Sequence, residues 1–241
     1  EKRVFGRKPR YSRSGGDLPM MTELKRRPVT FGLLILTTII FMAIQVFRFG
    51  NTTSSQTIFE FGGMYGLYLQ YDPSQLWRLM TPIFVHIGWQ HFLFNIFAIF
   101  VVGQLAEQVW GSWRFLILYL LSGIMGNVFT LFLTPDVVAA GASTSIFGVF
   151  AAITVAGYFG HNPYLKQMGQ SYQALIVVNL IFNLFMPNVG LVGHIGGLVG
   201  GLLAAVFLPT LHEKNMFQTW QRLLAGGVYL LLTLGMIFLA L

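Results

Sequence analysis

Long apolar blocks separated by short polar segments run through the chain from about residue 30 to its end. A hydrocarbon core about 30 Å thick needs roughly 20 apolar residues per crossing helix. Backbone groups in lipid must also bond within their own segment, which favours helices. The pattern therefore predicts an all-α, polytopic transmembrane bundle of seven spans, at about residues 30–47, 89–109, 112–133, 143–159, 171–187, 190–210 and 223–241, the fourth and fifth being the shortest.

The connection between the first and second spans is the longest, at about 40 residues, and is rich in aromatic residues and glycine but poor in charge. Such a segment is expected to fold at the membrane interface, where amphipathic rings are favoured. No internal repeat is visible in the chain. This weighs against a transporter built from inverted repeats.

Composition supports the membrane assignment and removes several kinds of site. Of 241 residues, 55% are apolar and 10% charged, far from the average of soluble domains. Cysteine is absent, which excludes disulfides, a thiolate nucleophile and cysteine-ligated metals. We expect neither a metal nor an organic cofactor.

The basic residues predict the orientation. The net charge is +7, and nine of the fifteen Lys and Arg residues precede residue 28. We interpret residues 1–28 as a basic cytosolic tail near anionic lipid and not as a nucleic-acid-binding arm, because no folded basic domain or interleaved aromatic residues accompany it. With this tail inside, thirteen basic residues face the cytosol and only Arg48 and Arg78 face outward. The C-terminus then lies outside.

Under this orientation the second, fourth and sixth spans all start at the outer face, and each carries a polar residue near its start. These residues are His91 and Asn95, Ser143, and His194. A serine hydroxyl becomes a nucleophile when a base removes its proton, and His194 is a suitable base. Asn95, His91 and the free N–H groups at the start of the fourth span are candidate donors to an oxyanion. No acidic residue lies in spans four to six, so we expect a Ser143–His194 dyad without a third member.

The sixth span carries the small-residue sequence HIGGLVGG, and the fourth span has Gly148, Ala151 and Ala152. Small residues allow helices in membranes to approach closely, as Ser143 and His194 require. Phe147 lies one turn below Ser143, so its ring is expected against the His194 imidazole. Taken alone, Ser143 is more typical of helix packing, and GASTS lacks the final glycine of the G-x-S-x-G elbow. The joint placement of four polar groups at one depth favours a catalytic site.

An ordered set of motifs from about Trp77 to Ala205 resembles the rhomboid family of intramembrane serine proteases. The set comprises WR at Trp77 and Arg78, HxxxN at His91 and Asn95, GAS ending at Ser143, HIGGLVGG beginning at His194, and between them Gly103, Glu107, Gly111, Tyr119, Gly123 and Gly126. The seventh span, after the core, resembles a six-plus-one arrangement typical of bacterial members, whereas a mitochondrial form would add its extra span before the core.

The resemblance implies a six-helix protease core at 29–212, with a linker and an additional span at 213–241. It implies Ser143 as nucleophile, His194 as base, His91 and Asn95 at the oxyanion, and a water-filled cavity that His86 helps to supply or support. Its substrates would be transmembrane proteins, and its partners membrane lipids. Thr144 is a departure, because the family usually has glycine there. Its side chain would crowd the oxyanion pocket or contribute a hydroxyl.

Two other functions are compatible with parts of the pattern. A catalytically silent rhomboid-like protein would bind membrane clients without cutting them, but it would be expected to lack the Ser143–His194 pair. A transporter or channel would need ionisable residues near the bilayer centre. The one acidic residue near a span is Glu107, close to its cytosolic end. The sequence therefore favours an intramembrane endopeptidase.

Overall fold

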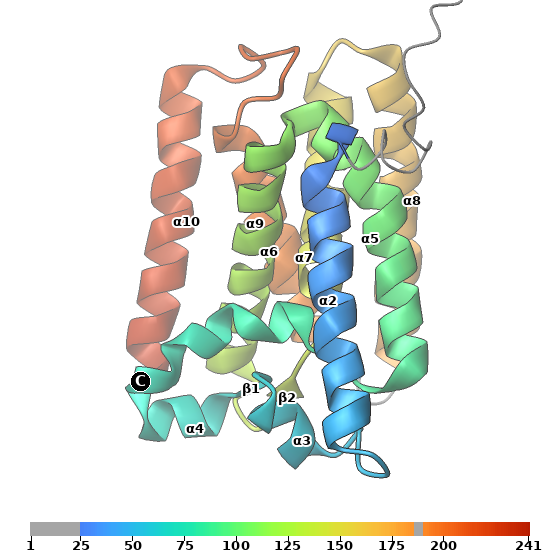
Figure 1. Ribbon diagram of the computed structural model, residues 1–241. Helices are drawn as coiled ribbons and strands as arrows, with labels where there is room; N and C mark the ends of the chain where they lie inside the picture. The colour runs from blue at the N-terminus through green and yellow to red at the C-terminus, as the bar shows by residue number, and fades with distance from the viewer. Residues whose placement is uncertain (1–24, 186–189) are drawn as a thin grey trace, which may run out of the picture.

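The computed structural model describes residues 25–185 and 190–241, so most of the tail expected at 1–28 lies outside the described residues. The described residues form an all-α bundle, as the sequence predicts (Figure 1). Its long helices are α2 (Pro28–Phe47), α5 (Gly88–Trp110), α6 (Ser112–Leu133), α7 (Ser143–Phe159), α8 (Pro163–Phe185), α9 (Leu191–Phe207) and α10 (Thr219–Ala240). Five of them are long and apolar enough to cross a membrane, and α7 and α9 are shorter apolar helices of 17 residues each.

The fifth predicted span is wrong at its start and in its relative length. Helix α8 begins at Pro163 and not near residue 171, so α7 and α9 are the shortest of the long helices in the described part. The Asn162 side chain accepts from the Tyr164 N–H at 2.9 Å, and Pro163 follows it, a pairing that commonly starts a helix. Leu165 and Gly169 are buried in the polar first turns. Hydropathy alone misses this extension, because most of its residues are polar.

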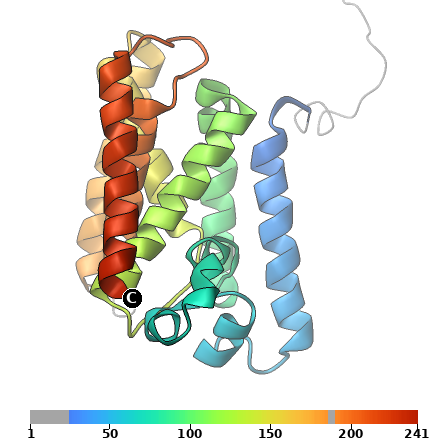
Figure 2. The ribbon, with the colours of Figure 1, turned by 90° about the vertical axis from the view of Figure 1, so that its left-hand side faces the viewer.

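The long connection, residues 48–87, folds across one end of the bundle (Figures 1 and 2). We call this end, which also holds the loop at 134–142, the connection end. The connection contains α3 (Ser55–Glu60), β1 (Met64–Tyr65), α4 (Gly66–Tyr71) and the 3-10 helices η1 (Pro73–Leu79) and η2 (Thr81–Phe84). Arg78 holds it together, since its guanidinium donates to the carbonyls of Phe59 and Gly63 at 2.6 and 2.9 Å.

A two-residue strand pair joins the connection to the loop before α7. Strand β1 pairs antiparallel with β2 (Val138–Ala139), with Met64 opposite Ala139. The Gly141 N–H donates to the Pro82 carbonyl at 2.8 Å two residues further on. The sequence predicted no strand here, because a two-residue strand is too short to show a period. The consequence is that the chain entering α7 is fixed by backbone hydrogen bonds.

Helices α6, α7 and α9 form the closely packed centre of the bundle, while α2 and α10 lie on opposite sides of it (Figures 1 and 2). A Cβ built at Gly201 of α9 would overlap the backbone of Gly148 in α7. One built at Gly197 would overlap the backbone of Thr144. The expected small-residue contact between α7 and α9 is therefore present, and it brings the two backbones together.

Glu107 has a structural place at the end of the bundle opposite the connection end. Its carboxylate accepts from the N–H groups of Val29 and Thr30 at 3.0 and 2.8 Å, and from the hydroxyls of Thr30 and Ser112. The first N–H groups of a helix lack intrahelical partners and favour an anion. Glu107 thus caps α2, and its hydrogen bonds account for this acidic residue without an ion pathway.

Thr144 lies at the junction of the three central helices. Its Cγ2 lies 2.8 Å from the position that a Cβ at Gly126 of α6 would take, and 3.2 Å from that of Gly193 in α9. Its hydroxyl is buried without a hydrogen-bond partner in the described part of the chain. The side chain therefore fills a gap between helices lined by two glycines.

Replacement of this side chain tests the packing role. Because the Thr144 hydroxyl is buried and unpaired, Thr144→Val is expected to keep or raise the free energy of unfolding by up to about 1 kcal/mol. Thr144→Gly removes the packed atoms and is expected to lower it by about 1 to 3 kcal/mol. Unfolding in detergent with increasing SDS measures both. A Val variant less stable than the Gly variant would contradict the assignment.

Candidate active site

Ser143 is the first residue of α7, and the residues before it are held from the connection. The Ala142 N–H donates to His86 Nε2 at 3.3 Å, next to the bond from Gly141 to Pro82. The first intrahelical bond runs from the Ile146 N–H to the Ala142 carbonyl. The N–H groups of Ser143 and its two successors thus have no intrahelical acceptor. The Ser143 hydroxyl and these free N–H donors therefore lie together at the start of α7.

His194 lies in the first turn of α9, at the same end of the bundle, and faces Ser143. Its Nε2 is 2.8 Å from Ser143 Oγ, and the residue is only 7% exposed. The Phe147 ring stacks on the imidazole, with centroids 4.3 Å apart and planes 11° from parallel, as its position one turn below Ser143 predicts. This geometry suits proton transfer from a serine hydroxyl to a histidine base.

The other ring nitrogen of His194 has a partner that the sequence reasoning missed. Asn183, near the end of α8, has its amide nitrogen 2.6 Å from His194 Nδ1. The expected dyad without a third group is thus incomplete as a description of the contacts. The signal was available, because Asn183 is a polar residue close to the outer end of the predicted fifth span, at the depth of Ser143. Asn183 is neutral, whereas the third group of a serine–histidine pair is commonly an acidic residue.

His91 and Ser143 face the same small space beside Gly141. A Cβ at Gly141 would lie 2.6 Å from His91 Cε1, 2.7 Å from its Nε2 and 3.7 Å from Ser143 Oγ. Gly141 has φ of 125°, which side-chain-bearing residues rarely adopt. Glycine therefore leaves room between the imidazole and the hydroxyl.

Asn95 lies one turn along α5 from His91 and is buried. Its Nδ2 donates to the His91 carbonyl at 2.8 Å. An amide NH₂ has two protons to donate, so one remains available. The structure thus puts His91 beside Ser143 and leaves Asn95 with a free donor.

Of the two roles that the sequence allows for His86, the structure favours support. The residue is fully buried, and burial, followed by the nearby His91, lowers its pKa to about 3. A neutral ring can accept the Ala142 N–H, as the geometry requires. His86 therefore holds the loop that leads to Ser143. Thr144 is turned toward α6 and α9, which argues against both roles expected for it at the oxyanion.

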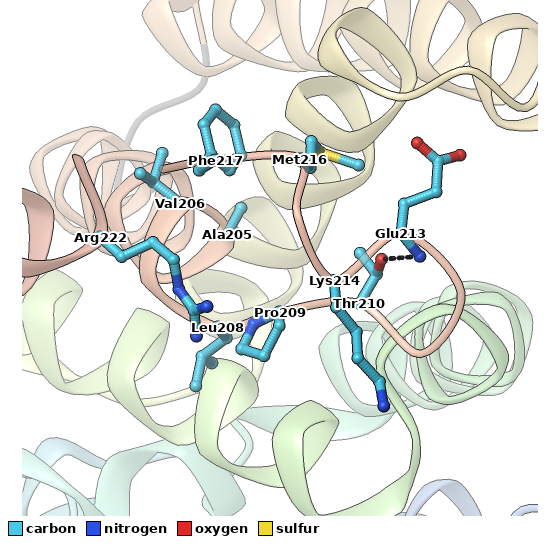
Figure 3. Close-up of a pocket in the computed structure, with 10 residues that line it drawn as sticks. All are labelled: Ala205, Val206, Leu208, Pro209, Thr210, Glu213, Lys214, Met216, Phe217 and Arg222. Atoms are coloured by element: carbon cyan, nitrogen blue, oxygen red, sulfur yellow. Dashed lines mark hydrogen bonds between the residues drawn. The ribbon is translucent and has the colours of Figure 1, made fainter. Parts of the chain in front are cut away.

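Two cavities in the described residues lie away from these groups. Figure 3 shows one between α9, the loop that follows it and the start of α10, where Glu213 N–H donates to Thr210. Its volume of about 10 Å³ is close to that of one water probe. A second cavity, of about 80 Å³, lies between the end of α5 and the start of α8. Both are at the end opposite Ser143, so neither belongs to this site.

Comparison with known proteins gives the same family as the motifs. A family model described as the Rhomboid domain matches residues 73–211. GluP of Bacillus subtilis, a rhomboid protease by name, is 34% identical over 207 residues, which cover 83% of this chain and 40% of GluP. YdcA of the same bacterium is 35% identical over 144 residues, 58% of this chain and 70% of YdcA.

Relatives whose names call them inactive also match. Inactive rhomboid-related protein 2 of Caenorhabditis elegans is 29% identical over 180 residues, 70% of this chain and 51% of that protein. The chain spans less than half the length of GluP. The match therefore shows family membership, and it does not show the activity of the whole relative. With the domain match covering more than half of its residues, the chain belongs to the rhomboid family, whose members are multi-pass membrane proteins.

Proposed function

We propose that this protein is an intramembrane serine endopeptidase that cleaves transmembrane proteins within or beside their spans. The observation that carries the proposal is the 2.8 Å contact between Ser143 Oγ and His194 Nε2 at the start of two apolar helices. We assign the core to residues 29–212, and residues 213–241 to a linker and an additional span.

The chemistry follows from the positions of the polar atoms. His194 Nε2 takes the proton of Ser143 as its Oγ attacks the scissile carbonyl, and later gives it to the leaving amine. The tetrahedral oxyanion would accept from the Ser143 N–H, the His91 ring and the free proton of the Asn95 amide. Water then hydrolyses the acyl-serine, again with His194 as base.

The substrate class follows from the location of the site. A transmembrane helix hides its carbonyls in internal hydrogen bonds, so a cut within a span needs an extended backbone. Suitable substrates would therefore carry helix-weakening residues near the scissile bond, and small residues there would fit beside Phe147 and His91. Membrane lipids are the surrounding partner, and we propose no nucleic-acid role.

The rival function is a catalytically silent rhomboid-like protein, and some relatives carry names that call them inactive. Against it stand the intact hydrogen bond between Ser143 and His194 and the stacked Phe147 ring. A protein that only binds clients needs neither a paired hydroxyl nor an oriented imidazole.

Substitution of the two central residues tests the activity. Purified protein in detergent is incubated with a single-span model substrate, and the product is followed on gels. Ser143→Ala and His194→Ala each remove one half of the proton-transfer pair, so the cleavage rate is expected to fall by at least about 10⁴-fold. Thr144→Val, next in the chain, is the control and should cleave within about twofold of wild type. Equal cleavage by Ser143→Ala would rule out this nucleophile.

Substitution of Asn95 tests the oxyanion assignment. A donor used only in the transition state lowers kcat when it is lost, so Asn95→Ala is expected to reduce kcat by about 10- to 1000-fold with little change in KM. Asn179→Ala is the matched control, because the Asn179 Nδ2 also donates to a carbonyl one turn back, that of Leu175, and this residue lies in α8 away from Ser143. An unchanged kcat for Asn95→Ala would exclude Asn95 from the site.

We further propose that the connection end, with Ser143, faces outward and that the N-terminus is cytosolic. The charge distribution supports this orientation, since the opposite end carries Lys25, Arg26 and Arg27 before α2, together with Arg114, Lys166, Lys214 and Arg222.

Protease protection in sealed right-side-out vesicles, whose lumen corresponds to the cytosol, measures the orientation. Protease added outside is expected to spare the basic N-terminal tail and to degrade it after the vesicles are opened with detergent. A tag at the C-terminus is expected to be cut without detergent. Loss of the tail in intact vesicles would reverse the assignment.

A further inference from the structure

We propose that Asn183 of α8 is a positioning residue, which holds His194 in the tautomer and ring orientation that the reaction needs. The catalytic unit is then a line of three groups, Ser143, His194 and Asn183. The inference rests on the proposed protease function, which it deepens.

The contacts of the imidazole carry the argument. One ring nitrogen, Nε2, is 2.8 Å from Ser143 Oγ, and the other, Nδ1, is 2.6 Å from the Asn183 amide. The ring face is covered by Phe147. Stacking fixes the plane of an imidazole but does not select which nitrogen carries the proton. A hydrogen-bond partner at Nδ1 does.

The direction of the hydrogen bond between Asn183 and His194 decides which ring nitrogen of the neutral imidazole carries the proton. The nitrogen and oxygen of an asparagine amide are assigned from their surroundings. We take the amide in the flipped orientation, with Oδ1 in place of Nδ2 toward His194, so that Nδ1–H donates to Oδ1 and Nε2 keeps a free lone pair for the Ser143 proton. After transfer, the imidazolium still donates from Nδ1 to that oxygen, and Nε2–H goes to the leaving amine. Asn183 stays neutral and takes no proton.

The packing of α8 indicates that this contact is specific. The buried residues of α8 are Leu165, Gly169 and Tyr172, all in its first half. In the second half, Phe182 and Leu184 are 60% and 67% exposed, while Asn183 between them is partly buried. Asn183 thus lies on the partly buried face of α8, together with Ile176, Asn179 and Leu180, and its neighbours Phe182 and Leu184 lie on the exposed face. It links this part of α8 to α9 through the base itself.

Three variants of α8 separate a positioning role from a structural one. Asn183→Ala removes the partner of Nδ1, and kcat is expected to fall about 10- to 100-fold with KM within about twofold. Asn183→Asp keeps the shape and the acceptor and should restore kcat at alkaline pH to within about threefold of wild type. Asn179→Ala, one turn earlier and bonded to the Leu175 carbonyl instead of to His194, is the control and should match wild type.

The pH profile is the readout that a packing role would not move. A carboxylate at position 183 favours the imidazolium, so the acid limb of the kcat profile of Asn183→Asp is expected to shift about 1 to 3 pH units upward. The titratable neighbour of this pair, His91, lies beside Ser143 and is the same in every variant. An acid limb that stays in place, or full kcat for Asn183→Ala, would overturn the inference.

The two proposals fail in different ways. If Ser143→Ala cleaves like wild type, the protease assignment falls. If Ser143→Ala is inactive and Asn183→Ala keeps full kcat, only the positioning role falls. Unfolding in detergent is measured for each variant, and the Asp variant is informative even if the Ala variant proves unstable.

Discussion

The close approach of α7 and α9 is the constraint on which the site depends. Where Gly201 meets Gly148 and Gly197 meets Thr144, no side chain separates the backbones. Only at this separation can a short serine side chain on one helix reach an imidazole on the other. Lipid tails are as apolar as the helices, so small residues and tight van der Waals contact, and not hydrophobic burial, must hold this pair together.

A second constraint acts at the start of α7. The connection at 48–87 bonds the loop before Ser143 at three levels, through the β1–β2 pair, the Gly141 N–H and the Ala142 N–H. Arg78 and the buried His86 stiffen the connection in turn. The N–H groups of residues 141 and 142 are thereby used up, whereas those at the start of α7 stay free. The backbone N–H groups that lack an intrahelical acceptor therefore lie at the position of the serine.

Much of the fold and part of the site could be predicted from the sequence. Spans of apolar residues are visible in the hydropathy of the sequence. The helix directions follow because successive spans cross the membrane in alternating directions. Ser143, His194 and Phe147 could be grouped because they lie at set depths on helices that start from one face. The start of α8 was wrong because its first turns are polar, and the strands β1 and β2 were missed because they are two residues long.

By itself, the sequence determined the helical class, the number of long apolar helices in the described residues, the glycine faces and the position of each polar residue along its helix. These are properties of local composition and of the helical repeat. The tertiary structure alone decided how the helices are rotated about their axes and which side chains meet. That rotation puts Asn183 on His194, turns Thr144 into a gap between glycines, and places His86 under Ala142. Such contacts depend on packing between segments far apart in the chain, and no local pattern records them.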